Sequence, residues 1–339
     1  MTNSIFLSND TINSNLVNSM KTLNRACKKF NIDNSQEEKE LSPILCEAVY
    51  EYSLINKEVT QVLNEASSTL VEIWDKIQAF AKKVLTIVLK LWKTVSAFIR
   101  NTLSKVREYA LKGILSQEVQ SERVIIKMVR CVDYSQKGVK IPSKTLIAIH
   151  VLLDDFIKTF KRITNAKHIS KVLSKAEDFL NDSKNTSKES DFLDAVKQSI
   201  DTAQNKKTLF NDFKNNLNNT INNIKPMTLD ITKGEAQEAY KQLLKELDIL
   251  ENKVNLASDY SAQVVNICQN LPKDYKKRCQ EITKKKSSPE IKKIHQIVAR
   301  QVKIEISLAH YFHSDLLRLF VRYASWLGRD CLMFAVAIS

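Results

Sequence analysis

The sequence predicts an all-α protein of about eight to ten helices in an elongated antiparallel helical bundle. The first observation is a scarcity of turn-forming residues, because the 339 residues include only 4 Gly and 5 Pro. Sheets with tight hairpins depend on Gly and Pro for their turns. The second observation is a spacing of three and four between apolar residues, which is typical of helices. The third is a pair of helix-start signals, Ser42-Pro43 and Ser288-Pro289, in which Ser caps the helix and Pro takes its first position.

The N-terminal part of the chain divides into two regions. Residues 1–40 are expected to hold a helix over 8–30, followed by a polar linker over 31–40. Residues 41–133 form a helical region that starts at the Ser-Pro cap. Three helices are expected there, and they cover Ile44 to about Glu65, 67–112 and 117–131.

The helix over 67–112 carries the strongest pattern in the chain. Its apolar residues recur in alternating steps of four and three, and from Lys76 to Arg107 it has eight basic and no acidic residues. This pattern predicts a basic amphipathic helix with one apolar face. The residues assigned to that face, as an assembly or membrane face, are Trp74, Phe80, Val84, Val88, Leu91, Trp92, Val95 and Phe98.

Residues 143–339 are expected to form a helical bundle after a break at YSQKGVKIPS, residues 134–143. Pro272 is expected to end one long helix, because proline lacks the amide hydrogen that an interior helical position needs. A basic loop over 273–286 would follow, and the apolar tail CLMFAVAIS would either pack or insert. The helices expected in this region cover 143–163, about 166–181, 188–203, 205–225, 232–271 and 288–328.

Several kinds of chemistry are excluded by the glycines, which stand singly at positions 113, 138, 234 and 328. The chain therefore has no GxGxxG or GxxxxGK[ST] phosphate loop and no GxSxG nucleophile elbow. The six cysteines show no CxxC and no zinc-finger spacing, so reduced thiols are expected, with a Cys268–Cys279 disulfide left open. The N-terminus lacks the features of a signal peptide.

Two pairs that contain histidine are the candidates for metal binding or catalysis. His310 and His313 share a helical face, but Asp315 would point elsewhere, about 200° around the helix from His313. His150 and Asp154 could orient one another for acid–base chemistry, yet helical pairs of this spacing are common. We therefore expect structural histidines, no metal, no cofactor and no enzymatic activity.

The formal charge of +14 is concentrated in two blocks. Residues 67–170 contain 19 basic and 8 acidic residues, and residues 272–339 contain 14 and 6. Basic blocks of this kind suit nucleic acid or anionic lipid, although a solvated basic face is the alternative. The candidate contacts to nucleic acid or an anionic surface are Lys82, Lys83, Lys90, Lys93, Lys276, Lys277, Arg278, Lys284, Lys285 and Lys286.

Three environments are open for the segment 76–100. A membrane span is disfavoured, because the longest run without a charge has six residues, Val84 to Leu89, against about 20 needed. An amphipathic helix lying on a membrane surface fits the basic face and the aromatic residues. A helix buried in its own core or in an oligomer interface fits equally well, with lysine side chains reaching out to water.

Two segments resemble internal head, or inner-body, proteins of large tailed bacteriophages. They are the basic helix IWDKIQAFAKKVLTIVLKLWKTVSAFIR and the C-terminal helix IVARQVKIEISLAHYFHSDLLRLFVRYAS. The resemblance implies a non-enzymatic virion protein in the capsid interior, made in the host cytoplasm and packed beside DNA. It also implies other capsid or inner-body proteins as partners, with assembly into a homo-oligomer as a further expectation.

The resemblance further implies trimming by a prohead protease after Glu in Ser/Ala-x-Glu motifs. Ser35-Gln36-Glu37 matches this motif in the expected linker, so Glu37 would end an N-terminal propeptide. Four other matches end at Glu118, Glu189, Glu238 and Glu290.

The leading hypothesis is thus a structural virion protein that contacts packaged DNA non-specifically. Two alternatives are a membrane-active, pore-forming type of helical protein that inserts around 67–112, and a cytoplasmic helical scaffold.

Overall fold

The structure, a computed structural model, is mostly helical, as the sequence predicts. It describes residue 25 and residues 35–65, 67–110, 117–135, 138–140, 143–163, 165–182, 185–284 and 290–339. The helix expected over 8–30 lies outside these residues, apart from residue 25.

Seven long helices and a single-turn helix account for most of the described residues. The helices are α2 (Ser35–Asn64), α3 (Leu70–Ala110), α4 (Gln117–Gln120), α5 (Lys144–Ile163), α6 (Lys167–Asn181), α7 (Thr186–Asn222), α8 (Lys233–Thr283) and α9 (Glu290–Ile338). The strands are β1 (Arg123–Val129), β2 (Asp133–Ser135), β3 (Gly138–Lys140) and β4 (Met227–Thr232). The expected number of eight to ten helices is therefore too high for this part of the chain.

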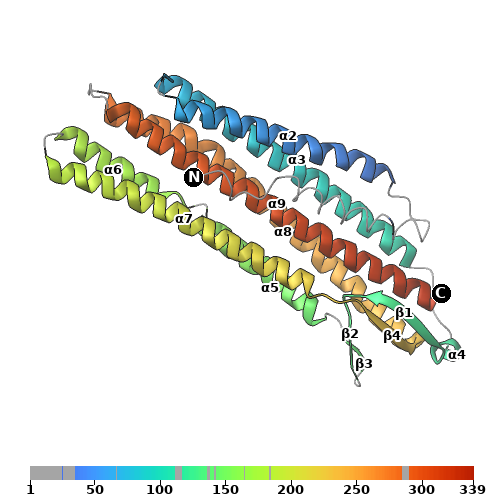
Figure 1. Ribbon diagram of the computed structural model, residues 1–339. Helices are drawn as coiled ribbons and strands as arrows, with labels where there is room; N and C mark the ends of the chain where they lie inside the picture. Colours follow the sequence, from blue (N-terminus) through green and yellow to red (C-terminus); the bar gives the residue numbers. More distant parts are fainter. Residues whose placement is uncertain are drawn as a thin grey trace.

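The helices form an elongated assembly in which α8 and α9 run along the middle (Figure 1). On one side lie α2 and α3, and on the other lie α5, α6 and α7. Helix α3 packs along both α8 and α9, so the regions 41–133 and 143–339 share one hydrophobic core. The small strands gather at one end of the assembly, near the C-terminus.

Helix α9 is the centre of the core because it is apolar on nearly all sides. Between residues 305 and 335 most of its side chains are buried, among them Phe312, Phe320 and Phe334. A helix with apolar residues all round its circumference must be covered on every side. The tail CLMFAVAIS continues α9 to Ile338, and most of its side chains pack in the hydrophobic core. Of the two expectations for the tail, the structure shows packing.

The helix expected over 117–131 is wrong, because only Gln117–Gln120 are helical and Arg123–Val129 form strand β1. Strand β1 pairs antiparallel with β4, more than a hundred positions away, with Ile126 opposite Leu229. A bulge between Ile126 and Val129 adds one residue to β1, and Met128 there has a φ of 65°. The β-branched run Val124-Ile125-Ile126 suits a strand, and Ile126 and Val129 face the core.

Helices α7 and α8 are longer than expected. The single helix α7 replaces the two expected over 188–203 and 205–225, because Phe210, Phe213 and Leu217 continue its buried seam. Helix α8 continues through Pro272 to Thr283, so the expected stop and the basic loop over 273–286 are wrong. Buried residues on both sides of Pro272 show that packing outweighs the lost hydrogen bond.

The start of α2 also differs from the prediction. The helix begins at Ser35, ahead of the expected cap at Ser42-Pro43, so residues 35–40 are helical rather than a linker. Glu37 therefore lies in a helix, whereas exposed loops are the usual sites of proteolysis. The four other motif matches, which end at Glu118, Glu189, Glu238 and Glu290, also lie in helices.

Candidate polyanion interface

The apolar face of α3 is covered by the protein's own helices. Trp74 lies against α9, where its indole Nε1 donates to Nδ1 of His295 at 2.8 Å. Trp92 meets the ring of Phe320 edge to face, with the ring centroids 6.0 Å apart. All of the residues assigned to this face are buried: Trp74, Phe80, Val84, Val88, Leu91, Trp92, Val95 and Phe98. The assignment of these residues to an assembly or membrane face is therefore corrected. Of the three environments left open for this helix, the structure shows burial in the protein's own core.

None of the described helices combines the length and the apolar character that crossing a membrane requires.

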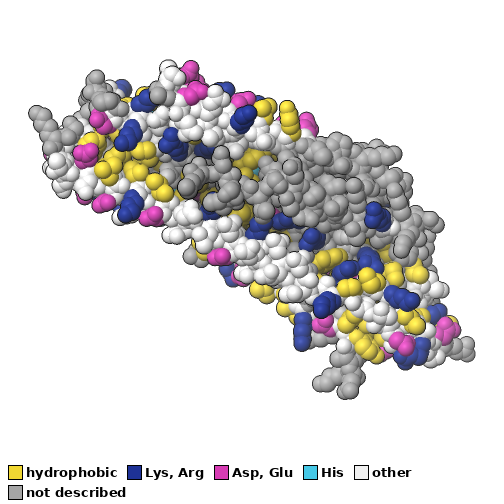
Figure 2. Space-filling model, viewed as in Figure 1, with side chains coloured by type: hydrophobic (Ala, Val, Ile, Leu, Met, Phe, Trp, Pro, Cys, Tyr) yellow, Lys and Arg dark blue, Asp and Glu magenta, His cyan; other side chains and the backbone are white. Residues whose placement is uncertain are grey.

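The opposite face of α3 carries a stripe of exposed lysines. Lys82, Lys83, Lys90 and Lys93 are all exposed, as the amphipathic pattern predicts. Their spacing keeps them within about 100° of the helix circumference. We call these four residues the α3 lysine stripe. Elsewhere, Lys and Arg side chains are dispersed over the visible face of the molecule rather than gathered in one patch (Figure 2).

Helix α2 matches part of this positive charge. It contains six acidic and two basic residues, and two of its glutamates reach α3. Glu47 binds Lys90 at 2.9 Å, and Glu58 binds Lys76 at 3.4 Å. Within the described part of the chain, Lys82, Lys83 and Lys93 form no ion pair. The stripe therefore contains three unmatched lysines and one that α2 already pairs.

The second basic group lies on the last turns of α8. Lys276 binds Asp75 of α3 at 3.0 Å, and Lys277 stands 3.9 Å from Glu281. Arg278 donates to Ser170 at 2.8 Å, with its guanidinium over the ring of Tyr275. These intramolecular contacts reduce the charge that the group offers to a polyanion. Lys284 is exposed at the end of α8, and Lys285 and Lys286 lie outside the described residues.

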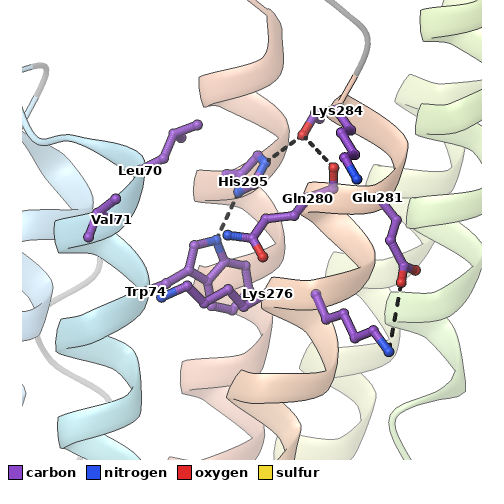
Figure 3. A pocket seen from close by; sticks show the side chains of 10 residues that line it. Leu70, Val71, Trp74, Lys276, Gln280, Glu281, Lys284 and His295 are labelled. Carbon is purple, nitrogen blue, oxygen red and sulfur yellow. Dashed lines mark hydrogen bonds and ion pairs between the residues drawn. The ribbon is translucent and has the colours of Figure 1, made fainter.

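The second basic group lies beside a recess between the start of α3 and the end of α8 (Figure 3). We call it the α3–α8 recess. Its lining combines Trp74 from the expected apolar face with three of the expected basic contacts. The lining residues are Leu70, Val71, Trp74, Lys276, Lys277, Gln280, Glu281, Thr283, Lys284 and His295.

His310 and His313, the two histidines on one helical face, are buried in the core. His310 stacks on Tyr52 with ring centroids 4.2 Å apart, and burial lowers its pKa to about 3. The Nδ1 of His313 contacts the Ala309 carbonyl at 2.6 Å, and burial lowers the pKa of His313 to about 4. Asp315 pairs with Arg318 instead of the histidines. Among the described residues, no group of three or more His, Cys, Asp or Glu could hold a metal ion.

His150 and Asp154, the other candidate pair, each bind another partner rather than one another. His150 Nε2 lies 3.1 Å from Glu246 of α8 and 3.0 Å from the hydroxyl of Tyr323 of α9. Asp154 instead binds Lys253 at 3.1 Å. The contact of His150 with Glu246 and Tyr323 joins α5, α8 and α9. These residues are too far apart in the sequence for their spacing to reveal the contact.

A second buried ionic group was not anticipated. Lys206 of α7 binds both oxygens of Glu305 of α9, and its third contact is the carbonyl of Asn165 at 2.7 Å. His168 of α6 stands 3.4 Å from the same carboxylate. Burial raises the pKa of Glu305 to about 7 and lowers that of His168 to about 4. The only sequence signal is a Lys and a Glu on otherwise apolar helix faces.

The cysteines are free thiols where the structure describes their side chains. Cys131, Cys268, Cys279 and Cys331 are buried and unpaired by disulfides. Burial raises the pKa of Cys268 and that of Cys279 to about 12, so neither is a reactive thiolate at neutral pH.

Comparison of the chain with protein-family models, with curated proteins and with solved structures finds no match in any of the three. The resemblance to internal head proteins therefore stays a prediction from the sequence.

Proposed function

We propose that this chain is a non-enzymatic structural protein that contacts nucleic acid without sequence preference. The contact surface is the α3 lysine stripe. The biological setting that we propose is the capsid interior of a tailed phage, beside packaged DNA and other inner-body proteins, as the sequence resemblance implies. For this role we propose that the helices form one elongated antiparallel bundle that acts as a rigid rod.

The observation that carries the proposal is the contrast between the two faces of α3. Its apolar face is used up in the core, whereas Lys82, Lys83 and Lys93 are exposed and form no ion pair with another described residue. Since an α-helix rises about 1.5 Å per residue, these lysines cover about 16 Å along its axis. Duplex DNA carries about one negative charge per 1.7 Å of its axis, so several phosphates lie within that length.

The contact has the character of charge neutralisation. Lysine is a flexible point charge rather than a planar fork, so it suits phosphate contact and supports little base recognition. Binding by release of counterions weakens as salt rises, with a slope of about −0.9 per phosphate contacted.

The membrane-active alternative would require α3 to leave the core and expose Trp74 and Trp92. The contacts of α3 oppose its release from the core, because α2, α8 and α9 all pack on it. A cytoplasmic scaffold would have the same fold without the affinity for nucleic acid, so a binding experiment separates it from the leading proposal.

The test is the salt dependence of binding to a mixed-sequence DNA duplex, measured by fluorescence anisotropy. Replacing Lys82, Lys83 and Lys93 by Gln should weaken binding and make the slope shallower by about 3. The control replaces Lys158, Lys188 and Lys241 by Gln, because each already pairs with a neighbouring carboxylate. Equal losses in the two triple variants would show a general charge effect and remove the stripe from the proposal. No salt-dependent binding by the wild type would remove the function itself.

A further inference from the structure

We propose that the α3–α8 recess binds a small amphiphilic monoanion, a molecule with an apolar body and one acidic group. This site is separate from the α3 lysine stripe and does not depend on contact with nucleic acid. The proposal follows from the size of the recess and from the chemical difference between its walls.

The recess is large enough for a small molecule. Its volume is about 570 Å³, within the range of about 300–1,000 Å³ that is usual for ligand sites. It lies between two helices, with α9 behind them, so its walls are rigid elements rather than loops (Figure 3).

The wall formed by α3 is apolar. Leu70 and Val71 line the recess from the start of α3, and Trp74 lies one turn further along the helix (Figure 3). Val71 is 61% exposed, which is high for an aliphatic side chain at the edge of a core. A ligand with an apolar body would remove this surface from water, and the hydrophobic effect would favour its binding.

The floor of the recess is polar but already satisfied. The Trp74 N–H is used in its bond to His295 Nδ1, so the hydrogen of that imidazole lies on Nε2 and faces the Thr283 oxygen at 3.4 Å. The Thr283 hydroxyl donates to the Cys279 carbonyl at 2.8 Å. Burial lowers the pKa of His295 to about 4, so the floor is uncharged at neutral pH. A charged or strongly polar ligand body would find no partner there.

The wall formed by α8 is cationic, but most of its charge is matched. Lys276 extends toward α3 and binds Asp75, and Lys277 stands beside Glu281. Lys284 is exposed and has no ion pair with another described residue. One unmatched ammonium group favours one negative charge on the ligand, with the Gln280 amide as a further polar partner. A molecule with several phosphates would meet Glu281 without enough unmatched cations to offset their repulsion.

The test uses anilinonaphthalene sulfonate, a fluorescent monoanion with an apolar body, on the folded full chain. We expect saturable binding at one site, with energy transfer from Trp74. Val71→Asp should weaken binding by about tenfold or more, because it replaces apolar surface under the body of the dye with a carboxylate that would lose its hydration and would repel the anion. Lys284→Gln should weaken binding by a few fold, since it removes one exposed charge partner. Both residues are exposed, so the variants should fold.

Two control substitutions match these changes on other surfaces. Leu256→Asp alters an aliphatic residue of α8 that is 65% exposed, and Lys158→Gln removes an exposed ammonium from α5. Neither should change the binding of the dye. Wild-type affinity in Val71→Asp, or an equal loss in Leu256→Asp, would overturn the site.

Competition tests the chemical class. Decanoate, an apolar chain with one carboxylate, should displace the dye, whereas pyrophosphate at the same concentration should not. Displacement by pyrophosphate as effective as that by decanoate would show a general anion site and overturn the amphiphile. Loss of DNA binding in the lysine-stripe variants leaves all of these results unchanged, so the two proposals can fail separately.

Discussion

Lys206 of α7 holds both carboxylate oxygens of Glu305 of α9, at 2.7 and 2.8 Å, in the interior where the layer of α6 and α7 packs on α9. The pair is almost completely buried, with side-chain exposures of 7% and 2%. Burial lowers the pKa of Lys206 and raises that of Glu305, because both groups lose solvation. Such a pair fixes which residues of α7 and α9 face each other, since neither charge can be left alone in the interior.

The first prediction concerns the energy of this pair. Lys206→Met should lower the free energy of unfolding by about 3–5 kcal/mol, because it leaves the Glu305 carboxylate buried without its ammonium partner. The double variant Lys206→Met/Glu305→Leu should recover most of that loss, since desolvation of two charges largely offsets their attraction. Chemical denaturation at neutral pH measures both. A double variant as unstable as the single one would show that the ion pair is itself a large net stabiliser.

The second prediction is a loss of stability in mild acid. Burial lowers the pKa of His168, His295 and His313 to about 4 and that of His310 to about 3. The unfolded chain takes up these protons near pH 6.5 and the folded chain does not, so stability falls as the pH drops from about 6.5 to about 4. The raised pKa of Glu305 acts in the opposite direction, because its protonated form is favoured by folding.

Asp330, whose pKa burial raises to about 6, also opposes the histidines. Four histidines favour extra protons on the unfolded chain and two carboxyl groups favour them on the folded chain, so the unfolded chain binds at most about two more protons. The free energy of unfolding therefore changes by at most about 3 kcal/mol per pH unit. Thermal unfolding followed by circular dichroism should give a falling midpoint between pH 7 and pH 5. His310→Phe, which keeps a ring against Tyr52, should make this dependence shallower. A midpoint that stays level or rises over this interval would contradict the prediction.

The sequence predicts those elements whose information is local. The helical state of α3 and its apolar stripe could be predicted, because Trp74, Val84 and Val95 repeat with the helical period, whereas the pattern does not reveal what covers that stripe. The start of α5 after Ser143 could be predicted for the same reason. In these segments propensity, capping and apolar pattern agree, so tertiary contacts add to the local preference without opposing it.

The elements that the sequence does not reveal depend on distant partners. Strand β1 is a strand because β4 supplies its hydrogen bonds, and a short apolar run cannot be assigned to strand or helix by its period alone. Pro272 is a helix stop by local rules, yet buried residues beyond it keep α8 helical. The same holds for the site. The exposure of Lys82 and Lys83 follows from the pattern, whereas the pairing of Lys90 depends on Glu47 in another helix.

The third prediction concerns α2 as an intramolecular competitor of nucleic acid. Glu47 and Glu58 occupy Lys90 and Lys76, so a polyanion must displace them before it can use these lysines. The two pairs are about half exposed, and exposed ion pairs are worth about 0–1 kcal/mol each. Replacing both glutamates by Gln should therefore tighten binding to duplex DNA by a few fold at low salt. It should also make the salt slope steeper by up to about 2, since two more lysines reach phosphates.

The control for this prediction must change the net charge equally. Glu238→Gln with Asp191→Asn removes two carboxylates that pair with Lys241 and Lys175, away from α3. If affinity depends only on the overall charge, this control variant will tighten binding as much as the α2 variant does. If α2 competes locally, the α2 variant alone will steepen the salt slope. Lysine acetylation followed by mass spectrometry gives a second readout, because Lys90 should become more reactive when Glu47 is replaced, whether or not DNA binds.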